Sequence, residues 1–291
     1  MDLVRRALLA AAAALAATAC SAAKPAEKRT PPRFRVATFN INWGNVDLSK
    51  TVRTIRDSKA DLVALQETNA ESERHIRTKL RGDYATIFFR GHDGRYEAER
   101  FGLLVKSPVK ELKFVPPKGG IFGALILRTW LGGREVQIAN LHLMPWARGG
   151  GELIAMAKEM ARMEGTHATE ITNIHAALWG KVPTIVLGDF NSHSGMNAPV
   201  FLKKQGFVDS FASVTEHPER HPTWRWKHGG VVWTFRLDHI FHSGEMRTVS
   251  SRIVKCDSSD HDLVTSVLEW QPQKAGAAPD RAPAAEDDRG Q

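Results

Sequence analysis

Polar side chains that could bind a metal or move a proton recur in this sequence directly after short apolar runs. Four such runs end on polar groups, at residues 40–42, 66–67, 140–142 and 188–191, and two more polar segments follow at 236–240 and 259–261. If these ends share one rim of the fold, they bring together carboxylates, amides and imidazoles. The set is Glu67, Asp189, Asp238, Asp260, Asn40, Asn42, Asn191, His142 and His261.

This combination of side chains indicates hydrolysis of a phosphoester with the help of a metal ion. Carboxylate and amide oxygens without cysteine are hard ligands that suit Mg²⁺, Mn²⁺ or Ca²⁺ rather than structural zinc. Clustered acids repel one another unless a cation neutralises them, and histidines beside them could act as general acid and base. Each segment alone has a simpler reading: residues 188–191 could form an Asx turn, and Glu67 could be a first-turn acid of a helix.

The elements that must position these residues are those of a layered α/β protein. Apolar alternation and continuous apolar runs predict strands, and spacing at i, i+4 and i+7 predicts a helix that starts near residue 48 with Asp47 or Ser49 as N-cap. A long helical stretch covers 152–179, where Gly165 could interrupt it, and a short helix covers 195–205. The strands are expected at 34–41, 62–65, 84–89, 101–105, 121–130, 135–143, 183–187, 236–242, 247–254 and 262–270. Many strands and few helices predict two sheets packed face to face with helices outside.

The composition is that of an ordinary globular protein of 291 residues, with 42% hydrophobic and 25% charged residues. It excludes a collagen-like, wholly disordered or polytopic membrane protein. Lys and Arg total 40 against 32 Asp and Glu, a formal net charge of +8, and residues 24–271 carry all of it. The surplus favours an anionic partner: nucleic acid, a phospholipid surface or a small phosphate ester.

Both ends of the chain are expected to lie outside the folded domain. Arg5 and Arg6 precede the apolar run 7–19, which is too short to span a bilayer and has the layout of a secretory signal over residues 1–19. Residues 20–33 read as a flexible tether, 34–271 as the domain, and 272–291 as a disordered tail. We therefore expect an exported protein that is periplasmic, on the cell surface or secreted.

Two cysteines cannot form a disulfide framework. Cys20, just after the apolar run, offers an alternative to simple cleavage, namely a lipid anchor of the bacterial lipoprotein type. The leucine usual three residues before such a cysteine is Ala17 here. Cys256 would then be a buried structural thiol.

Several histidines and tryptophans have other readings. His217 and His221 have i, i+4 spacing, but the proline after each argues against a helical zinc pair. His167 and His175 are expected on the surface of the long helix. Residues 223–227 alternate aromatic and basic side chains, which suits either a loop that contacts nucleic acid or a strand with one buried tryptophan face.

In its motifs, this sequence resembles the endonuclease/exonuclease/phosphatase superfamily, which includes pancreatic-type DNases, AP endonucleases, inositol polyphosphate phosphatases and bacterial sphingomyelinases. The matching segments are Phe39-Asn40-Ile41-Asn42, Leu65-Gln66-Glu67, Asn140-Leu141-His142-Leu143, Gly188-Asp189-Phe190-Asn191, Leu237-Asp238-His239-Ile240-Phe241 and Ser259-Asp260-His261, spread over about 36–267. The resemblance implies a four-layer α/β/β/α sandwich of two packed mixed β-sheets flanked by helices, with a divalent-metal site at one end.

The resemblance also implies roles for the site residues. Glu67 is expected to bind the metal, with Asp260 and Asn42 on the metal side, although the family often has an acid where Asn42 stands. Asn40 is expected to contact metal or phosphate. Asp189 would orient the attacking water, with Asn191 beside it on the phosphate. His261 would be the general acid/base, oriented by Asp238.

His142 is similar to the histidine found in DNase and sphingomyelinase types, where AP-endonuclease types tend to place a tyrosine. Glu99-Arg100-Phe101 resembles a segment of pancreatic-type DNases. That match implies that Glu99 orients His142 and that Arg100 contacts the substrate backbone. The simpler interpretation is that Glu99 and Arg100 lie at a solvated strand end.

These observations predict an exported phosphodiesterase that depends on Mg²⁺ or Mn²⁺, with Ca²⁺ as an alternative, and that acts as a nuclease on nucleic acid. The alternatives are a phospholipid or small-molecule phosphodiesterase or phosphatase on the same fold, and a non-catalytic surface binding protein. No obligate protein partner is predicted.

Overall fold

The computed structural model describes residues 31–91, 99–146, 153–228 and 230–272. The predicted signal peptide, Cys20 and most of the predicted tail lie outside these residues. None of the described helices combines the length and the apolar character that a membrane crossing requires.

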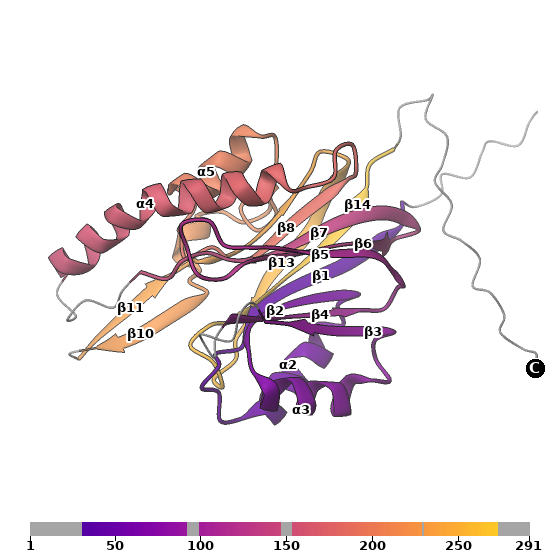
Figure 1. The fold of residues 1–291 in the computed structure, drawn as a ribbon, viewed down its shortest axis with the longest axis horizontal. Coiled ribbons are helices and arrows are strands. Elements are labelled where there is room, and N and C mark those ends of the chain that lie inside the picture. The colour runs from indigo at the N-terminus through magenta and orange to yellow at the C-terminus, as the bar shows by residue number, and fades with distance from the viewer. Residues whose placement is uncertain (1–30, 92–98, 147–152, 229, 273–291) are drawn as a thin grey trace, which may run out of the picture. The chain divides into compact units, whose positions relative to one another are not determined.

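Two six-stranded mixed sheets form the centre of the fold (Figure 1). The first sheet has the order β13 (Met246–Val254), β14 (Leu263–Trp270), β1 (Arg33–Asn40), β2 (Leu62–Thr68), β4 (Arg100–Val105) and β3 (Thr86–Arg90). The second has the order β5 (Val109–Val115), β6 (Gly123–Leu131), β7 (Arg134–His142), β8 (Thr184–Asp189), β12 (Asp238–His242) and β9 (Val208–Asp209). Within each sheet one pair is parallel, β1 with β2 and β7 with β8.

Helices cover the outer face of each sheet. On the first sheet lie α2 (Leu48–Ser58) and α3 (Ala70–Leu80), and on the second lie α4 (Leu153–Ala176) and α5 (Asn197–Lys204) (Figure 1). Helix α2 begins where predicted, because the Asp47 side chain accepts a hydrogen bond from the Lys50 backbone N–H at 2.9 Å. The four-layer α/β/β/α sandwich expected from the sequence is confirmed.

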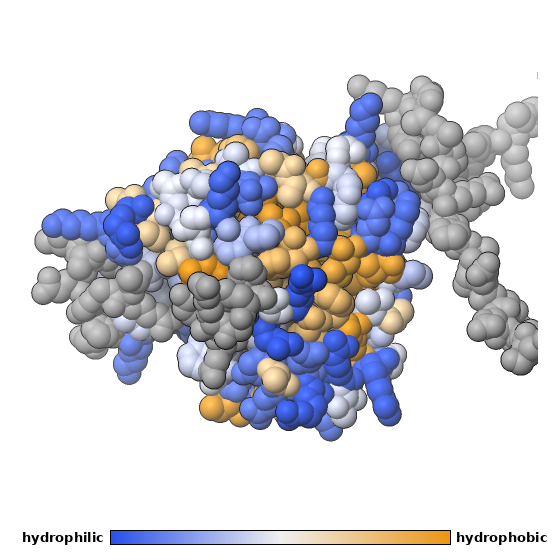
Figure 2. Space-filling model, in the orientation of Figure 1, coloured by the Kyte–Doolittle hydropathy of each residue, from blue (hydrophilic) through white to orange (hydrophobic). Residues whose placement is uncertain are grey.

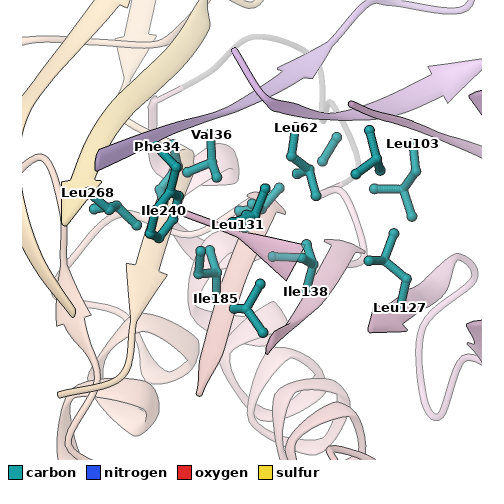
Figure 3. Packing of buried hydrophobic residues seen from close by; sticks show 14 of the residues in the cluster. Phe34, Val36, Leu62, Leu103, Leu127, Leu131, Ile138, Ile185, Ile240 and Leu268 are labelled. Carbon is teal, nitrogen blue, oxygen red and sulfur yellow. The ribbon is translucent and has the colours of Figure 1, made fainter. Parts of the chain in front are cut away.

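The main core lies between the two sheets. Side chains of the first sheet, such as Val36 and Leu62, meet side chains of the second, such as Ile138 and Ile185, with no exposed surface (Figure 3). On the surface, hydrophilic residues gather over α2 and α3, and apolar residues emerge along the strands between the layers (Figure 2). This packing joins the two sheets through one shared core.

Some elements were not predicted. These are α3, β5, β9 and β11 (Val231–Phe235), which pairs antiparallel with β10 (Trp224–His228) to form a hairpin. Helix α4 runs through Gly165 without interruption. Residues 223–227 take the strand alternative: Trp224 is buried and Trp226 is half-buried.

Candidate active site

The polar strand ends of both sheets meet at one edge of the sandwich. The parallel strands β1 and β2 carry Asn40 and Glu67 at their carboxyl ends, and β7 and β8 end at His142 and Asp189. Strand β12 runs antiparallel to β8, so its first residue, Asp238, pairs in register with Asp189. His261, just before β14, completes the edge through a bridge to Trp224.

His261 lies between two buried carboxylates. Its Nδ1 is 2.8 Å from Asp238 Oδ2, and its Nε2 is 3.5 Å from Asp189 Oδ2. The side chains of both carboxylates are almost fully buried. Because a carboxylate only accepts, Nδ1 carries the proton that Asp238 binds, and Nε2 is left toward Asp189.

Burial and these contacts shift the pKa values of His261 and Asp189. Burial alone would lower the pKa of His261, but Asp238 and Asp189 outweigh it and raise the pKa to about 10. Burial raises the pKa of Asp189 to about 7, against the opposing effect of His261. The result is a cationic imidazole beside a carboxyl group that can exchange a proton near neutral pH.

Glu67 and His142 form the next part of the edge. Asn40 Nδ2 donates to Glu67 Oε1 at 2.9 Å and to Asp189 Oδ2 at 3.0 Å. His142 Nε2 lies 3.6 Å from Asp189 Oδ2 and 4.0 Å from Glu67 Oε1. Burial lowers the pKa of His142 to about 3, and its ring stacks on Phe122 at 4.0 Å between centroids. His142 is therefore a neutral hydrogen-bonding group, while burial raises the pKa of Glu67.

Asn42 and Asp260 form a hydrogen-bonded pair that joins the site through Asn40. Asn42 Nδ2 donates to Asp260 Oδ1 at 2.8 Å, and Trp224 Nε1 donates to Asp260 Oδ2 at 3.1 Å. The Asn42 backbone N–H in turn donates to Asn40 Oδ1 at 3.0 Å. The structure thus brings the predicted metal-side residues together as one hydrogen-bonded group.

Three of the site residues adopt the left-handed backbone conformation that side chains disfavour. Their φ angles are 58° at Asn42, 54° at Glu67 and 45° at Asn191. At Asn191 the backbone N–H donates to Asp189 Oδ1 at 2.9 Å, which holds the turn. Such strain persists where surrounding contacts over-determine it, and it clusters at functional sites.

A narrow pocket opens onto the site, and its lining includes aromatic residues that were not predicted to belong to the site. Polar catalytic candidates form one wall. Apolar side chains form the other: Pro145, Trp146, Trp224, Trp226 and Leu237. Two indoles are fixed in place, because Trp146 Nε1 donates to Asn191 O at 2.8 Å and Trp224 Nε1 donates to Asp260. The aromatic–basic alternation at 223–227 was the available signal for Trp224 and Trp226; none pointed to Trp146.

Arg100 is engaged elsewhere. Its Nη2 is 2.6 Å from Glu73 Oε2 on α3, so a substrate phosphate would have to compete with this ion pair. Glu99 is buried just before β4, near Gly91. Its role in orienting His142 stays a prediction, as does the substrate contact of Arg100.

The donor set fits a hard divalent cation. Ligand atoms of Glu67, His142 and Asp189 lie within 4.8 Å of one another, as do those of Asp189, Asp238 and His261. The Glu67 side chain, 20% exposed, is the most accessible of these carboxylates. Oxygen ligands with imidazole and no thiolate suit Mg²⁺, Mn²⁺ or Ca²⁺, so Glu67 is the residue best placed to hold the ion.

A second group of buried polar side chains lies on the opposite face of β12. Arg236 binds Asp209 through two hydrogen bonds, of 2.9 and 3.3 Å, and His239 Nδ1 lies 3.0 Å from Arg236 Nη1. Here every charge has a partner of opposite sign. Burial alone would raise the pKa of Asp209, but His239 and Arg236 hold it well below its usual value.

The prediction that His167 lies on the surface of the long helix is wrong. Its ring has no exposed surface, because α4 packs this face onto the loop after β7 and the turn after β8. His175 is half-buried against Phe201 and Phe207. The periodicity of a helix predicts a buried face, but a polar side chain on that face is hidden from this reasoning.

Comparison with known proteins identifies the class of fold and site. A sequence model of the Endonuclease/Exonuclease/phosphatase family matches residues 37–261, and the chain belongs to that family. Members of this family are hydrolases that act on phosphoester bonds. A search of curated proteins found no significant match.

Solved structures agree on the fold. An endonuclease/exonuclease/phosphatase from Beutenbergia cavernae DSM 12333 is 18% identical with a TM-score of 0.62, over 82% of this chain and 72% of that one. A family protein from Bacteroides thetaiotaomicron is 15% identical with a TM-score of 0.63, over 84% and 100%. D. rerio TDP2, complexed with a single-stranded DNA product, is 17% identical with a TM-score of 0.60, over 81% and 99%.

Proposed function

We propose that this protein is an exported, divalent-metal-dependent phosphodiesterase that cleaves nucleic acid. One observation carries the proposal: His261 is held between Asp238 and Asp189, and it lines the same pocket as Glu67. This arrangement supplies a proton donor, a proton acceptor and a carboxylate for a cation within one small volume.

The residues divide the work by their charge states. Asp189, with a pKa of about 7, accepts a proton from the attacking water and fixes its direction. His261 is cationic and presents Nε2–H to the phosphate or to the leaving oxygen, while Asp238 holds its ring through Nδ1. Neutral His142 donates a hydrogen bond rather than a proton.

The metal is expected to be Mg²⁺ or Mn²⁺, held by Glu67. When bound, such an ion neutralises charge on the phosphate oxygens and offsets the repulsion among the clustered carboxylates. Asn42 and Asp260, which are hydrogen-bonded to each other, would be its further ligands or would orient them.

Nucleic acid is the proposed substrate for three reasons. The net charge of +8 favours a polyanion. The aromatic wall of Trp146, Trp224 and Trp226 offers a surface on which a base or sugar beside the cleaved phosphate could stack. A protein of the same fold, D. rerio TDP2, binds a single-stranded DNA product.

Export remains part of the proposal on sequence grounds alone. The basic residues Arg5 and Arg6 and the apolar run 7–19 have the layout of a secretory signal, and Cys20 could carry a lipid anchor. Mass spectrometry of the protein purified from its own cells tests this. Loss of residues 1–19 supports export, a diacylglycerol mass on Cys20 selects the anchored form, and an intact Met1 refutes both.

The activity is tested by incubating the purified protein and Mg²⁺ or Mn²⁺ with plasmid, single-stranded DNA, RNA, sphingomyelin and a chromogenic phosphodiester, with His261→Ala as the control. We expect cleavage of nucleic acid that falls steeply as salt rises, because phosphate contacts release counterions. Salt-insensitive cleavage of a small phosphoester, with none of nucleic acid, would overturn the nuclease assignment.

A phospholipid phosphodiesterase is the second candidate, and one surface feature favours it. Val231 and Val232 at the start of β11 are 51% and 58% exposed, and Val46, in the loop after β1, is 98% exposed. Val46 and Val232 line the same hollow beside Asn42 and Asp260. Hydrolysis of sphingomyelin in vesicles, lost in a Val231→Ser/Val232→Ser variant that keeps activity on the chromogenic diester, would establish this alternative.

A further inference from the structure

Helix α4 presents two buried polar side chains to the loop that follows β7. His167 and Glu170 lie one turn apart and are 0% and 2% exposed. Both contact Met144, which lies between His142 and the pocket residue Trp146. His167 and Glu170 therefore contact the backbone of the loop that links His142 to Trp146.

The two side chains hold both polar groups of Met144. Glu170 Oε2 accepts from the Met144 N–H at 3.0 Å, and His167 Nε2 lies 2.7 Å from the Met144 carbonyl oxygen. Because the carbonyl can only accept, His167 Nε2 carries the proton, and Nδ1 of the neutral ring accepts. The Ser192 hydroxyl, 2.7 Å from Nδ1, is its donor.

We call the contacts of His167 and Glu170 with Met144 the clamp. Ser192 connects the clamp to the turn after β8, which is the second loop of the active site. It follows Asn191 in the turn that begins at Asp189, and His239 Nε2 contacts its carbonyl oxygen at 2.9 Å. The two loops are also joined directly, since Asn191 Nδ2 donates to Leu143 O at 3.0 Å. His167 is thus a single side chain that bridges both loops.

Fold stability alone does not explain Glu170. Its Oε1 is buried without a hydrogen-bond partner among the described residues, and Oε1 lies against Gly120, where a Cβ atom would clash. A half-satisfied buried carboxylate costs free energy that an apolar side chain of similar size would not. Burial accordingly raises the pKa of Glu170 to about 7. The group makes sense as an acceptor placed for the Met144 N–H.

We propose that His167 and Glu170 are positioning residues that set Trp146 and Asn191 at the distance the reaction requires. This inference rests on the proposed phosphodiester hydrolysis by the neighbouring Asp189 and His261. Without the clamp, the loop after β7 would shift relative to the turn after β8, and the aromatic wall would move away from the catalytic wall.

The test compares paired variants. His167→Ala removes both contacts of the ring, whereas His167→Gln keeps a donor for the Met144 carbonyl. Glu170→Leu removes the acceptor, whereas Glu170→Gln keeps one. His175→Ala is the matched control, because His175 is on the same helix but packs against Phe201 and Phe207 rather than the active-site loops.

Below the melting temperature, we expect His167→Ala and Glu170→Leu to lower kcat by about 10- to 100-fold and to raise KM, as loss of supporting contacts does elsewhere. The two amide variants should recover most of that loss. His175→Ala should keep the kcat of the unmodified protein even if it melts earlier. Equal kcat in His167→Ala and His175→Ala would overturn the proposal.

A readout independent of turnover separates this proposal from the proposed function. The Trp146 indole N–H, which donates to Asn191 O, can be assigned by NMR with a Trp146→Phe variant. Its hydrogen exchange should accelerate at least about tenfold in His167→Ala and stay unchanged in His175→Ala. If the unmodified protein cleaves no phosphodiester, the proposed function fails; unchanged exchange in His167→Ala refutes the clamp in either case.

Discussion

Two histidine–carboxylate groups lie on opposite faces of strand β12, and they differ in how the charge of the carboxylates is balanced. Strand β12 contributes Asp238 to one group and His239 to the other. On one face Asp238 binds His261, and Asp189 adds a second carboxylate. On the other face Asp209 lies 3.4 Å from His239, but Arg236 supplies a full positive charge. The contacts found for Asp189 and Asp238 in the described ranges include no arginine or lysine.

This difference teaches how to tell a reactive pair from a structural one. A buried carboxylate with an arginine partner is locked in its charged form, so it holds the fold but has no proton to exchange. A carboxylate whose partner is a histidine, in a site open to a pocket, can change its protonation state. The following predictions test whether that distinction holds.

Metal removal should produce the largest effect. EDTA should abolish turnover and Mg²⁺ or Mn²⁺ should restore it, because the carboxylates on the catalytic face outnumber the one cationic imidazole, His261, that lies among them. Glu67→Gln should reduce turnover by about 10³-fold or more, equivalent to several kcal/mol of transition-state stabilisation. Rates with and without chelator check this; full activity in EDTA, with no metal retained, rules out the metal-dependent mechanism.

Loss of the catalytic histidine should come next. His261→Ala should lower kcat by about 10²–10⁴-fold, and Asp238→Asn should cost much of the same. The double variant should lose little more, because residues that act as one unit are non-additive. If the two losses multiply independently, Asp238 and His261 do not work as a pair.

A substitution in the group of Arg236, Asp209 and His239 should lower the stability of the fold rather than turnover. Asp209→Asn leaves the buried Arg236 with only the half-exposed Glu219 as an ionic partner, and it should lower the free energy of unfolding by up to about 3–5 kcal/mol at pH 7. Because the pKa of Asp209 is depressed in the folded state, its contribution is present above the unfolded pKa of about 3.9 and is lost as pH falls below it.

Urea unfolding at pH 7 and pH 3 measures this contribution. The difference in the free energy of unfolding between the unmodified protein and Asp209→Asn should be smaller at pH 3 than at pH 7. Turnover per folded molecule should change little. A large loss of turnover with unchanged stability would show that the group on this face also takes part in catalysis.

The smallest effect should be that of Asp189→Asn on stability. Its sign should be opposite to that of Asp209→Asn. Burial raises the pKa of Asp189 to about 7, so its charged form destabilises the fold above that pH. In metal-free protein at pH 8, Asp189→Asn should leave the melting temperature unchanged or raise it by a few degrees, while removing activity. A fall of many degrees would mean that Asp189, like Asp209, stabilises the fold.

The sequence predicted the sandwich because its strands are short, apolar and bounded by turn residues. Helix α3 was missed because it starts right after β2, and its mean polarity hides the buried positions Ile76 and Leu80. Strand β5 was missed because Lys110 and Lys113 break the apolar pattern. Propensity reads local pattern, whereas these elements are stabilised by their neighbours in the fold.

The polar residues of the site were predictable because each stands where an apolar strand has no use for it. Trp146 was not, since a tryptophan beside a strand resembles ordinary core. The buried His167 was missed because only the three-dimensional approach of α4 to Met144 and Ser192 gives it partners. Contacts between segments distant in sequence leave no local pattern.

The order of strands in the first sheet has a consequence for synthesis. Strand β1 lies between β2 and β14, and the Ser259 hydroxyl donates to the Asn40 carbonyl across 219 residues of chain. A polypeptide that emerges amino end first can pair β1 with β2 early, but it cannot complete the catalytic edge until residues 259–261 have left the ribosome. The earliest and latest translated parts of the domain therefore have to meet before the site is complete, and a chain that ends before residue 259 lacks His261.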